Sequence, residues 1–313
     1  MKRLVTSEQV QELFKVQLEN WQLARENYLA LGRIKTKRFQ YDDFEIHLQF
    51  NPARLVSSAA KTDNKSLKER KCFLCPANLP EEQRGLPFGD DYQVLVNPFP
   101  IFPEHFTIPL LKHLPQSLST RFEDMLDMAT ALDKYVIFYN GPRCGASAPD
   151  HAHFQAGNKG FLPIEKEWKS IDKELLWERT GLKLYTLKNY LRSVLIIESE
   201  HKTDAAELFK SVYEMLEVKA GEEEPMFNVL TWREEDKWIV CLFLREKHRP
   251  ACYSIEGDGN LLLSPGAVDM GGVLIIPLEK DFEKITKEDV STVFREVRLN
   301  DMDKLSMRLK REL

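Results

Sequence analysis

The stretch Pro149-Asp-His-Ala-His-Phe-Gln155 places two of the seven histidines of the chain and a glutamine at every second position. Side chains alternate between the faces of a β-strand, so His151, His153 and Gln155 are expected on one face, with successive side chains about 7 Å apart. The two apolar residues between them are expected to face a core. The pattern predicts a strand that presents three nitrogen-bearing side chains to one surface, where they can hold a metal, attack a phosphorus atom, or do neither.

The composition is that of an ordinary globular protein. The chain has 313 residues, 43% hydrophobic and 30% charged, which suffices for two domains or one large one. The net charge of -5 argues against a general affinity for nucleic acid or an anionic membrane. No signal peptide is evident, and the longest apolar runs are too short to span a bilayer. Five cysteines favour reduced thiols or metal ligands over disulfides, so the expected location is the cytoplasm.

The order of the expected elements favours an α+β fold in two lobes, each an antiparallel sheet with flanking helices. Thr6 and Gln9 have the spacing of a capping box, which would open a helix that runs to about Leu31. Strands are expected at residues 44–50, 94–96, 106–109, 135–139, 185–198, 226–233, 237–245 and 272–276. Helices are expected at residues 119–132, in a charged region at 164–180, and at 203–218 and 287–297.

We place the two lobes at residues 1–180 and 181–313. The polar and basic segment 57–71 between the first expected strands predicts a mobile loop.

A second group of candidate metal ligands begins at Lys71-Cys-Phe-Leu-Cys-Pro76. A redox role for this Cys-x-x-Cys pair is disfavoured, because no expected strand precedes it and no expected helix follows it. A zinc site needs two further ligands for tetrahedral closure, and His113 and His151 are candidates beside Cys72 and Cys75. The alternative is that the cysteines are buried thiols and that His113 caps the end of a strand.

The loop before the histidine strand, Asn140-Gly-Pro-Arg-Cys-Gly-Ala-Ser-Ala-Pro-Asp150, is rich in glycine. Gly141 and Gly145 would allow a ligand to approach the backbone closely, and Ser147 can donate to a phosphate oxygen. The alternative is an ordinary hairpin loop. Cys144 is expected to be a packed thiol rather than a nucleophile, because no base is evident near it.

Several blocks of sequence carry a resemblance to a known family. They are VLVNPFPIFPEHFTIP (94–109), YNGPRCGASAPDHAHFQ (139–155) and LLLSPGAVDMGGVLIIP (261–277). In this order they resemble the nucleotidyl-transferring branch of the histidine triad superfamily. That branch contains galactose-1-phosphate uridylyltransferase, the diadenosine tetraphosphate phosphorylases and the GDP-hexose phosphorylases. Two further pieces, QFNPARL (49–55) and HLPQSL (113–118), resemble the GDP-hexose phosphorylases in particular.

The resemblance implies two histidine-triad-like lobes, of which the second completes the substrate pocket. It implies one active site per chain, since the second half has no His-x-His motif. His153 matches the nucleophile that attacks the α-phosphorus, and Gln155 matches the residue that holds the phosphoryl oxygens. The ligands of a structural zinc ion are matched by Cys72, Cys75, His113 and His151.

The resemblance also supplies substrate-binding residues. Asn97 and Phe99 match positions near the nucleoside, while Asn140 and Ser147 match residues that orient the nucleophile and the phosphate. His105 matches the histidine that opens the central strand of the family, and the sequence assigns it no role.

The chemistry of the two central side chains supports this interpretation. An imidazole is a good nucleophile at neutral pH when an acceptor fixes one nitrogen, which a backbone carbonyl in the glycine-rich loop would do for His153. Gln155 can donate to phosphate oxygens but cannot act as a proton source. A third histidine at that position would favour hydrolysis. The glutamine instead favours a lasting nucleotidyl-histidine that is passed to a second acceptor, as in a transferase or phosphorylase.

The second half contributes a group of cations in Phe243-Leu-Arg-Glu-Lys-His-Arg-Pro250. If this segment is a strand, Arg245, Lys247 and Arg249 share one face, where like charges repel unless they are solvated or face an anion. We predict a phosphate clamp that reaches across the lobe boundary. The alternative is a solvated edge strand.

We therefore predict a nucleotidyltransferase or phosphorylase that acts on a nucleoside diphosphate hexose, with GDP-hexose favoured by residues 49–55 and 113–118. The alternatives within the family are a diadenosine tetraphosphate phosphorylase and a hexose-1-phosphate uridylyltransferase. The Cys-x-x-Cys pair at Cys72 and Cys75 favours the uridylyltransferase. Outside it are a zinc hydrolase, with His151 and His153 both on the metal, and a non-catalytic nucleotide-binding protein. The expected partners are a nucleotide or nucleotide sugar and phosphate, with neither nucleic acid nor membrane, in a monomer or homodimer.

Overall fold

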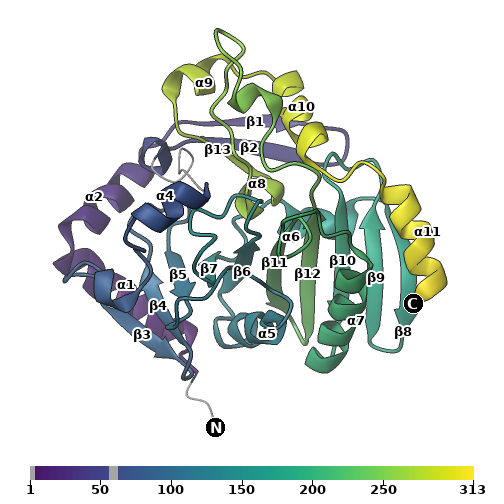
Figure 1. Ribbon diagram of the computed structural model, residues 1–313, viewed down its shortest axis with the longest axis horizontal. Coiled ribbons are helices and arrows are strands. Elements are labelled where there is room, and N and C mark those ends of the chain that lie inside the picture. The colour runs from purple at the N-terminus through teal and green to yellow at the C-terminus, as the bar shows by residue number, and fades with distance from the viewer. Residues whose placement is uncertain (1–3, 56–62) are drawn as a thin grey trace.

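The computed structural model describes residues 4–55 and 63–313 (Figure 1). The helices are α1 (Ser7–Asn20), α2 (Gln22–Leu31), α4 (Asn64–Glu69), α5 (Phe122–Ala131), α6 (Ile164–Ser170), α7 (Lys202–Met215), α8 (Ala267–Met270), α9 (Glu279–Lys284), α10 (Lys287–Val297) and α11 (Met302–Glu312). The strands are β1 (Thr36–Gln40), β2 (Glu45–Phe50), β3 (Gly85–Phe88), β4 (Tyr92–Val96), β5 (His105–Pro109), β6 (Tyr135–Asn140), β7 (His153–Asn158), β8 (Lys173–Arg179), β9 (Leu182–Leu187), β10 (Val194–Ser199), β11 (Phe227–Glu234), β12 (Lys237–Leu244) and β13 (Val273–Ile276).

Ten of the strands form one antiparallel sheet in the order β3-β4-β5-β7-β6-β11-β12-β10-β9-β8. Its two halves have the same plan. Each half begins with three consecutive strands that lie side by side (β3 to β5, or β8 to β10). A helix follows (α5 or α7), and then two more strands. The last strand (β7 or β12) pairs between the third (β5 or β10) and the fourth (β6 or β11). The halves meet where β6 pairs with β11. The predicted α+β class is confirmed, but the two expected sheets are joined edge to edge into one.

Several expected elements differ from the observed ones at their ends. The single strand expected at 185–198 is two strands, because the chain turns at Asn189, whose φ is +52°. The charged region 164–180 is helical only to Ser170 and then forms β8. The helix that starts after the capping box of Thr6 and Gln9 breaks at Trp21, which has an extended backbone. Of the loop expected at 57–71, residues 57–62 lie outside the described residues, and Asn64–Glu69 is helix α4.

The expected lobe boundary between residues 180 and 181 falls in the turn of the β8–β9 hairpin, whose strands pair directly. Because a boundary there would separate paired strands, we propose that the change of lobe lies instead between the end of β7 and the start of α6.

A smaller sheet of β1, β2 and β13 covers one face of the large sheet. Strand β13 is parallel to β2, with Val273 opposite His47 and Ile276 opposite Phe50. This pairing brings two blocks that are more than 200 residues apart in the sequence, 49–55 and 261–277, to the same place. In Figure 1 the small sheet lies above the large sheet, together with α9 and α10.

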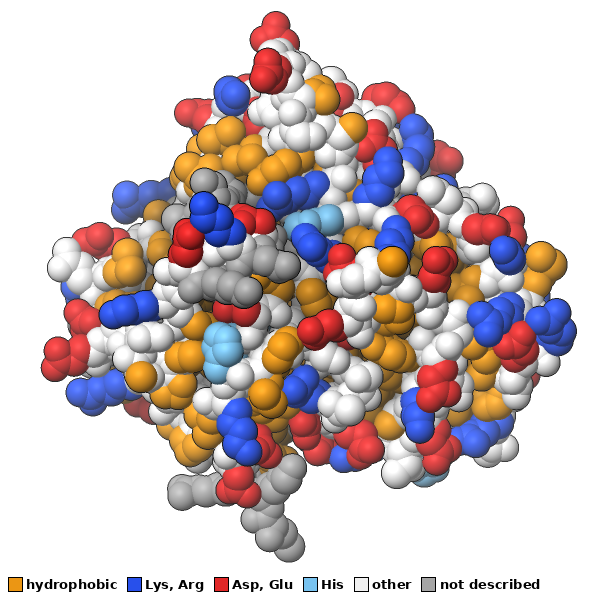
Figure 2. Space-filling model, viewed as in Figure 1, with side chains coloured by type: hydrophobic (Ala, Val, Ile, Leu, Met, Phe, Trp, Pro, Cys, Tyr) orange, Lys and Arg blue, Asp and Glu red, His pale blue; other side chains and the backbone are white. Residues whose placement is uncertain are grey.

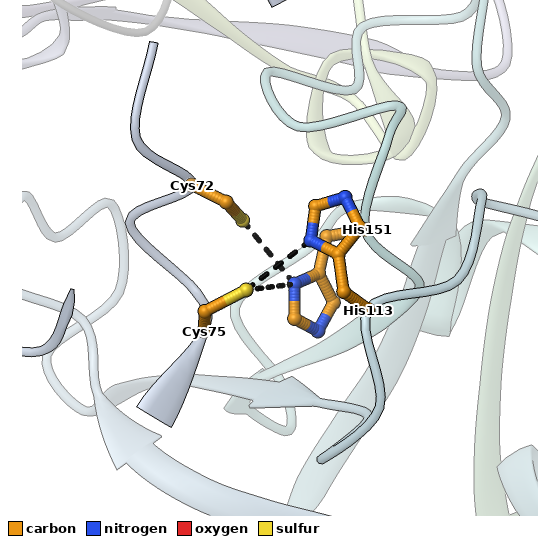
Figure 3. Close-up of side chains that lie close together, drawn as sticks. All are labelled: Cys72, Cys75, His113 and His151. Atoms are coloured by element: carbon orange, nitrogen blue, oxygen red, sulfur yellow. Dashed lines mark hydrogen bonds between the residues drawn. The ribbon is translucent and has the colours of Figure 1, made fainter. Parts of the chain in front are cut away.

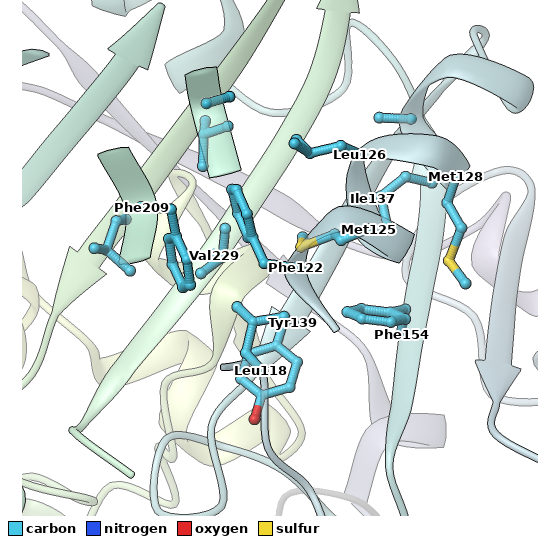
Figure 4. Close-up of a cluster of buried hydrophobic side chains, with 14 of the residues drawn as sticks. Leu118, Phe122, Met125, Leu126, Met128, Ile137, Tyr139, Phe154, Phe209 and Val229 are labelled. Atoms are coloured by element: carbon cyan, nitrogen blue, oxygen red, sulfur yellow. The ribbon is translucent and has the colours of Figure 1, made fainter. Parts of the chain in front are cut away.

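The opposite face of the large sheet is covered by α5, which packs against β6 and β11, and by α7, which packs against β10 (Figure 4). The rings of Phe122 in α5 and Phe209 in α7 stack with their centroids 3.8 Å apart. Burial of each such ring contributes about 1.5–3 kcal/mol to stability. The contact joins the helices of the two halves, so the halves share a core as well as a sheet.

Figure 2 shows that side chains of both charge signs are interspersed on the visible surface. Among the described residues, every helix is too short or too polar to cross a lipid bilayer.

Candidate active site

A cavity of about 640 Å³ brings together seven of the predicted site residues: Asn97, Phe99, Asn140, Gly145, Ser147, His153 and Gln155. Much of the remaining wall is apolar and includes Trp21, Leu23, Phe73 and Leu95. A smaller cavity of about 50 Å³ adjoins it, because Arg54, Asn140, Gly145 and Gln155 line both. The arrangement provides an apolar pocket of a size suited to a nucleoside beside a polar corner suited to phosphate.

His153 begins strand β7 and is held in one tautomer. Its Nδ1 lies 2.8 Å from the backbone oxygen of His151, so Nδ1 carries the proton and donates it. Burial lowers the pKa of His153 to about 4, against the raising effect of that hydrogen bond. The ring is therefore neutral near pH 7 and has its Nε2 lone pair available. The expected carbonyl acceptor is present, but it belongs to His151 and not to the glycine-rich loop.

Gln116, which the sequence analysis did not single out, fixes the backbone of His153. Its Nε2 donates to the backbone oxygens of Asn140 and His153, each at 3.0 Å, and its Oε1 accepts from the His153 N–H at 2.8 Å. The buried side chain thus takes the place of ladder hydrogen bonds between the end of β6 and the start of β7. The signal that marked it was the block HLPQSL, which contains this residue.

His105, to which the sequence assigned no role, orients the side-chain amide of Gln155. Its Nδ1 accepts from the backbone N–H of Ile101 at 3.2 Å, so the proton is on Nε2, which donates to Gln155 Oε1 at 3.0 Å. Burial, reinforced by the charge of Arg54, lowers the pKa of His105 to about 3 and keeps it neutral. Because His105 holds the oxygen of the Gln155 amide, the nitrogen of that amide is left to donate into the cavity.

Arg54 is a second residue that the sequence analysis missed. Its Nη1 donates to the backbone oxygen of Phe99 at 2.9 Å, and its side chain lines both cavities. Removal from bulk water lowers the pKa of Arg54 to about 10, so the guanidinium remains charged at neutral pH. It lies in the block QFNPARL, which the pairing of β2 with β13 brings to the site. Arg54 is thus a cation in the wall of the polar corner.

The glycine-rich loop approaches another part of the chain closely. Gly145 has a φ of +91°, and a Cβ at this position would lie 2.8 Å from the Cα of Gly266. Gly145 therefore meets the backbone of the 261–277 block, in addition to lining the cavity. Cys144 is fully buried, and burial raises its pKa to about 12, as expected of a packed thiol.

The four predicted metal ligands Cys72, Cys75, His113 and His151 form one cluster (Figure 3). One donor atom from each lies within 4.8 Å of all the others. His151 Nδ1 is 3.2 Å from Cys72 Sγ and 3.6 Å from Cys75 Sγ, and His113 Nδ1 is 3.2 Å from Cys75 Sγ. Two thiols and two imidazoles at these separations fit a tetrahedral ion such as zinc.

The outer contacts of the cluster fit a metal site as well. His151 Nε2 donates to the backbone oxygen of Leu110 at 2.7 Å, which leaves Nδ1 as the ligand atom. Asp150 lies 3.8 Å from His113 Nε2 and pairs with Arg70 at 2.5 Å. His153 is not part of the cluster, so the two histidines of the opening motif have separate surroundings.

The predicted clamp residues lie elsewhere. Strand β12 ends at Leu244, so the strand alternation expected to place Arg245, Lys247 and Arg249 on one face is absent. None of the three lines either of the cavities described above. The guanidinium of Arg245 is buried and makes five hydrogen bonds inside the protein, which is its full donor capacity. Arg249 Nε donates to Ser264, a residue in the wall of the smaller cavity.

Comparison with known proteins gives two family matches. Residues 13–158 match a family described as "Domain of unknown function (DUF4922)", and residues 165–304 match "GDPGP1-like, C-terminal domain". The change from one to the other lies between β7 and α6, where we place the lobe boundary.

Galactose-1-phosphate uridylyltransferases of two Lactococcus lactis strains are similar in sequence. That of Lactococcus lactis subsp. lactis (strain IL1403) is 26% identical over 225 residues, and that of subsp. cremoris (strain SK11) is 24% identical over 227 residues. Each match covers 64% of this chain and 44% of the relative, so the chain spans less than half the length of these relatives.

The fold is similar to that of yeast Ap4A phosphorylase. The crystal structure of that protein has a TM-score of 0.57 and 16% sequence identity, and the match covers 89% of this chain and 96% of the yeast chain. Its complex with Ap4A also has a TM-score of 0.57, with 17% identity over 91% of this chain and 97% of the yeast chain. The match of the second half, the sequence relatives and the shared fold support the resemblance of the chain to the nucleotidyltransferase branch of the histidine triad superfamily.

Proposed function

We propose that the protein is a nucleotidyltransferase of the phosphorylase type. It would cleave a nucleoside diphosphate hexose, with GDP-hexose favoured, through a covalent nucleotidyl-histidine. The observation that carries this proposal is the state of His153: its Nδ1 is bound to a carbonyl, which leaves Nε2 as a nucleophile in a cavity lined by two arginines and four side-chain amides.

In the first step Nε2 of His153 attacks the α-phosphorus. An N–P bond forms while the bond from that phosphorus to the bridging oxygen breaks, and hexose 1-phosphate leaves with the bonding electrons. Negative charge on the phosphoryl oxygens needs fixed donors, since such transfers depend mainly on positioning and charge stabilisation. The amide nitrogen of Gln155, the hydroxyl of Ser147 and the guanidinium of Arg54 are available in the cavity wall.

In the second step an oxygen of inorganic phosphate attacks the same phosphorus, and His153 leaves as neutral imidazole. The product is a nucleoside diphosphate. Gln155 cannot activate water as an imidazole would, which favours transfer over hydrolysis. The smaller cavity has room for a few water molecules or one small anion beside Arg54, and this supports phosphate as the acceptor.

The guanine preference is supported by three observations. The second half matches a GDPGP1-like family, and each of the two blocks that resemble GDP-hexose phosphorylases delivers a residue to the site, namely Arg54 and Gln116. Gln83 in the cavity wall donates through Nε2 to the backbone oxygen of Val96 at 3.0 Å. Its Oε1 is then an acceptor for an N–H group on the edge of a base, such as those of guanine.

We further propose a structural zinc ion at Cys72, Cys75, His113 and His151. Such an ion would fix the start of β7 through His151, whose backbone oxygen in turn orients His153. A zinc hydrolase is less well supported, because the Nδ1 of His153 is bound to a carbonyl and its ring lies outside the cluster.

The proposal is tested by incubating the protein with GDP-hexose that is labelled in the α-phosphate. A covalent nucleotidyl-histidine should appear as an acid-labile and base-stable label, and phosphate should release it as GDP. Parallel incubations with UDP-hexose and with Ap4A distinguish the three family activities by the substrate that labels fastest. Turnover without any labelled protein would contradict the covalent step.

A further inference from the structure

We infer that Arg245 and Asn228, two buried residues of the second half of the chain, are positioning residues for the first half. They determine which atom of the Asn140 amide faces the reacting phosphate. The inference rests on the proposed nucleotidyl transfer, because it assumes that a phosphate occupies the polar corner that Asn140 lines.

The orientation is set first at Arg245. A guanidinium can only donate hydrogen bonds, and Nη1 of Arg245 lies 2.7 Å from Oδ1 of Asn228. Asn228 must therefore turn its amide oxygen toward Arg245 and its amide nitrogen away from it. The same Nη1 donates to the backbone oxygen of Pro265 at 2.9 Å, next to the glycine that touches Gly145.

The orientation then passes to Asn140. Nδ2 of Asn228 donates to Oδ1 of Asn140 at 2.9 Å and to the backbone oxygen of Cys144 at 2.6 Å. The backbone N–H of Ala267 also donates to Oδ1 of Asn140, at 2.7 Å. With two donors on its oxygen, the Asn140 amide is left with its nitrogen toward the cavity. That nitrogen is a donor, which is what a phosphoryl oxygen requires.

The position of these residues makes the constraint strict. Asn140 and Asn228 are directly opposite each other in the β6–β11 pairing, where the two halves meet. Arg245, Asn228 and Asn140 are all at most 9% exposed, so water competes little for their hydrogen bonds. A flipped Asn140 amide would place its nitrogen against two buried donors, Nδ2 of Asn228 and the Ala267 N–H, and would leave both without an acceptor.

This chain of hydrogen bonds gives the cation of the second half a role without contact to the substrate. It also explains a buried arginine that has no carboxylate among its five hydrogen-bond partners, which are four backbone oxygens and the Asn228 amide. A buried charge is costly unless it is well bonded, and here its donors are used to fix the Asn228 amide and the loop around Pro265.

The test is the substitution Asn228→Asp. Aspartate keeps an oxygen for Arg245 and adds a favourable charge pair, but it cannot donate to Asn140. The Asn140 amide should then turn its nitrogen toward residue 228 and its oxygen toward the phosphate. We expect kcat for GDP-hexose phosphorolysis to fall about 100-fold with little change in KM, as when one transition-state donor is removed. The melting temperature should fall by only a few degrees, because the charge pair with Arg245 offsets part of the lost hydrogen bond to the backbone oxygen of Cys144.

A double-mutant cycle separates positioning from a structural defect. Asn140→Ala should cost a similar factor, and the double variant should be no slower than the slower single variant, because both changes remove the same donor. Thr231→Val is the matched control, since Thr231 is buried in the same strand and its hydroxyl has no partner among the described residues. It should keep the wild-type kcat and KM.

The inference is overturned if folded Asn228→Asp protein keeps the wild-type kcat, or if its loss and that of Asn140→Ala multiply. Should Asn228→Asp fail to fold, Asn228→Ser takes its place: its hydroxyl can accept from Arg245 but is too short to hold Asn140. We expect about a tenfold loss of kcat for it, and an unchanged kcat would equally overturn the inference. Failure of the proposed function would be visible separately, as wild-type protein that takes up no label, and the inference would fall with it.

Discussion

The two halves of the large sheet have the same order of strands but opposite chemistry on the face that carries the site. The row across the centre runs Thr107, Gln155, Phe138, Leu230, Cys241 and Ile196, with β6 and β11 in the middle. Gln155 and Cys241 thus lie at the same distance from the junction, one in β7 and the other in β12. Gln155 borders the cavity, whereas Cys241 is fully buried in the apolar core.

The neighbours of these residues extend the contrast. His153 shares its face with Gln155, and on β12 the alternate residues Ile239, Cys241 and Phe243 share the corresponding face. All three are core residues, and burial raises the pKa of Cys241 far above that of a reactive thiol. One half of a repeated frame is therefore equipped for chemistry, while the other is packed. We propose that the packed half affects the site only indirectly, through Arg245 and Asn228, which orient the Asn140 amide.

The strongest prediction compares the nucleophile, His153, with Cys241, the counterpart of Gln155 in the packed half. His153→Ala should lower kcat/KM by at least about 1,000-fold and abolish the labelled intermediate, since a missing nucleophile is not replaced. Cys241→Ala is the control from the other half. It should cost some stability through the small cavity it leaves, but keep turnover within about twofold. Steady-state kinetics and labelling check both, and a large loss of activity in Cys241→Ala would break the comparison.

The metal is expected to stabilise one half only. Cys75→Ser should remove one equivalent of zinc by elemental analysis and lower the melting temperature by more than about 5 °C, because metal binding is coupled to folding. Cys252→Ser changes a cysteine of the second half that lies outside the cluster, and it should keep both the metal and the melting temperature. Native protein that folds normally and holds no zinc would refute the site.

A smaller loss of activity is expected when His105 is replaced. His105 is the first residue of β5, and Val194 is the first residue of the matching strand β10. His105→Phe removes the donor that holds Gln155 Oε1, so the Gln155 amide can rotate and present its oxygen to the phosphate. We expect kcat to fall about tenfold, with the zinc content unchanged. Val194→Ala should leave kcat near the wild-type value. If His105→Phe melts at the wild-type temperature and is fully active, the assigned role is wrong.

The smallest effect concerns the pH dependence of stability at the junction. Glu224 accepts from the Leu118 N–H at 3.0 Å and from the Tyr139 hydroxyl, and burial raises its pKa from 4.5 to about 7. A raised pKa means that its share of stability is complete below about pH 4.5 and is lost as the pH rises through about 7.

Glu224→Gln tests this titration. Glutamine can accept from Leu118 and donate to the Tyr139 oxygen, as a protonated carboxyl does. The variant should therefore gain on the order of 1 kcal/mol relative to wild type between pH 5 and pH 8 in urea unfolding. A difference that does not vary with pH would show that Glu224 has an ordinary pKa.

Most of the candidate site residues could be predicted from the sequence, because they belong to short motifs with a fixed spacing. The spacing of His151, His153 and Gln155 within one strand, and of Cys72 and Cys75 within one turn, determines their geometry before any tertiary contact. Gln116 and Arg54 could not be identified in this way, since their roles depend on where β2, β6 and β7 lie relative to one another. The clamp prediction failed at the level of the strand: β12 ends at Leu244, where Arg245 turns inward to carbonyl groups that local sequence does not reveal.

The fold was predictable to a similar extent. Alternation located most strands, but it could not show that two sheets share an edge, because the β6–β11 pairing joins residues that are 88 to 94 positions apart. The turn at Asn189 was missed for a different reason. Apolar residues continue on both sides of it, so the hydrophobic pattern gave no break between β9 and β10.

The pairing of β6 with β11 has a consequence for the motions of the protein. A shared ladder at the centre of the sheet, between two layers of core, leaves no hinge at which the halves could open as rigid bodies. Amide protons of Ile137 to Asn140 and of Asn228 to Thr231 should therefore exchange with solvent only when the whole molecule unfolds. Asn140 lies in this ladder, and His153 and Gln155 lie in β7, which pairs directly with β6. Substrate entry would therefore rely on segments at the rim of the cavity and not on the sheet that aligns the reacting groups.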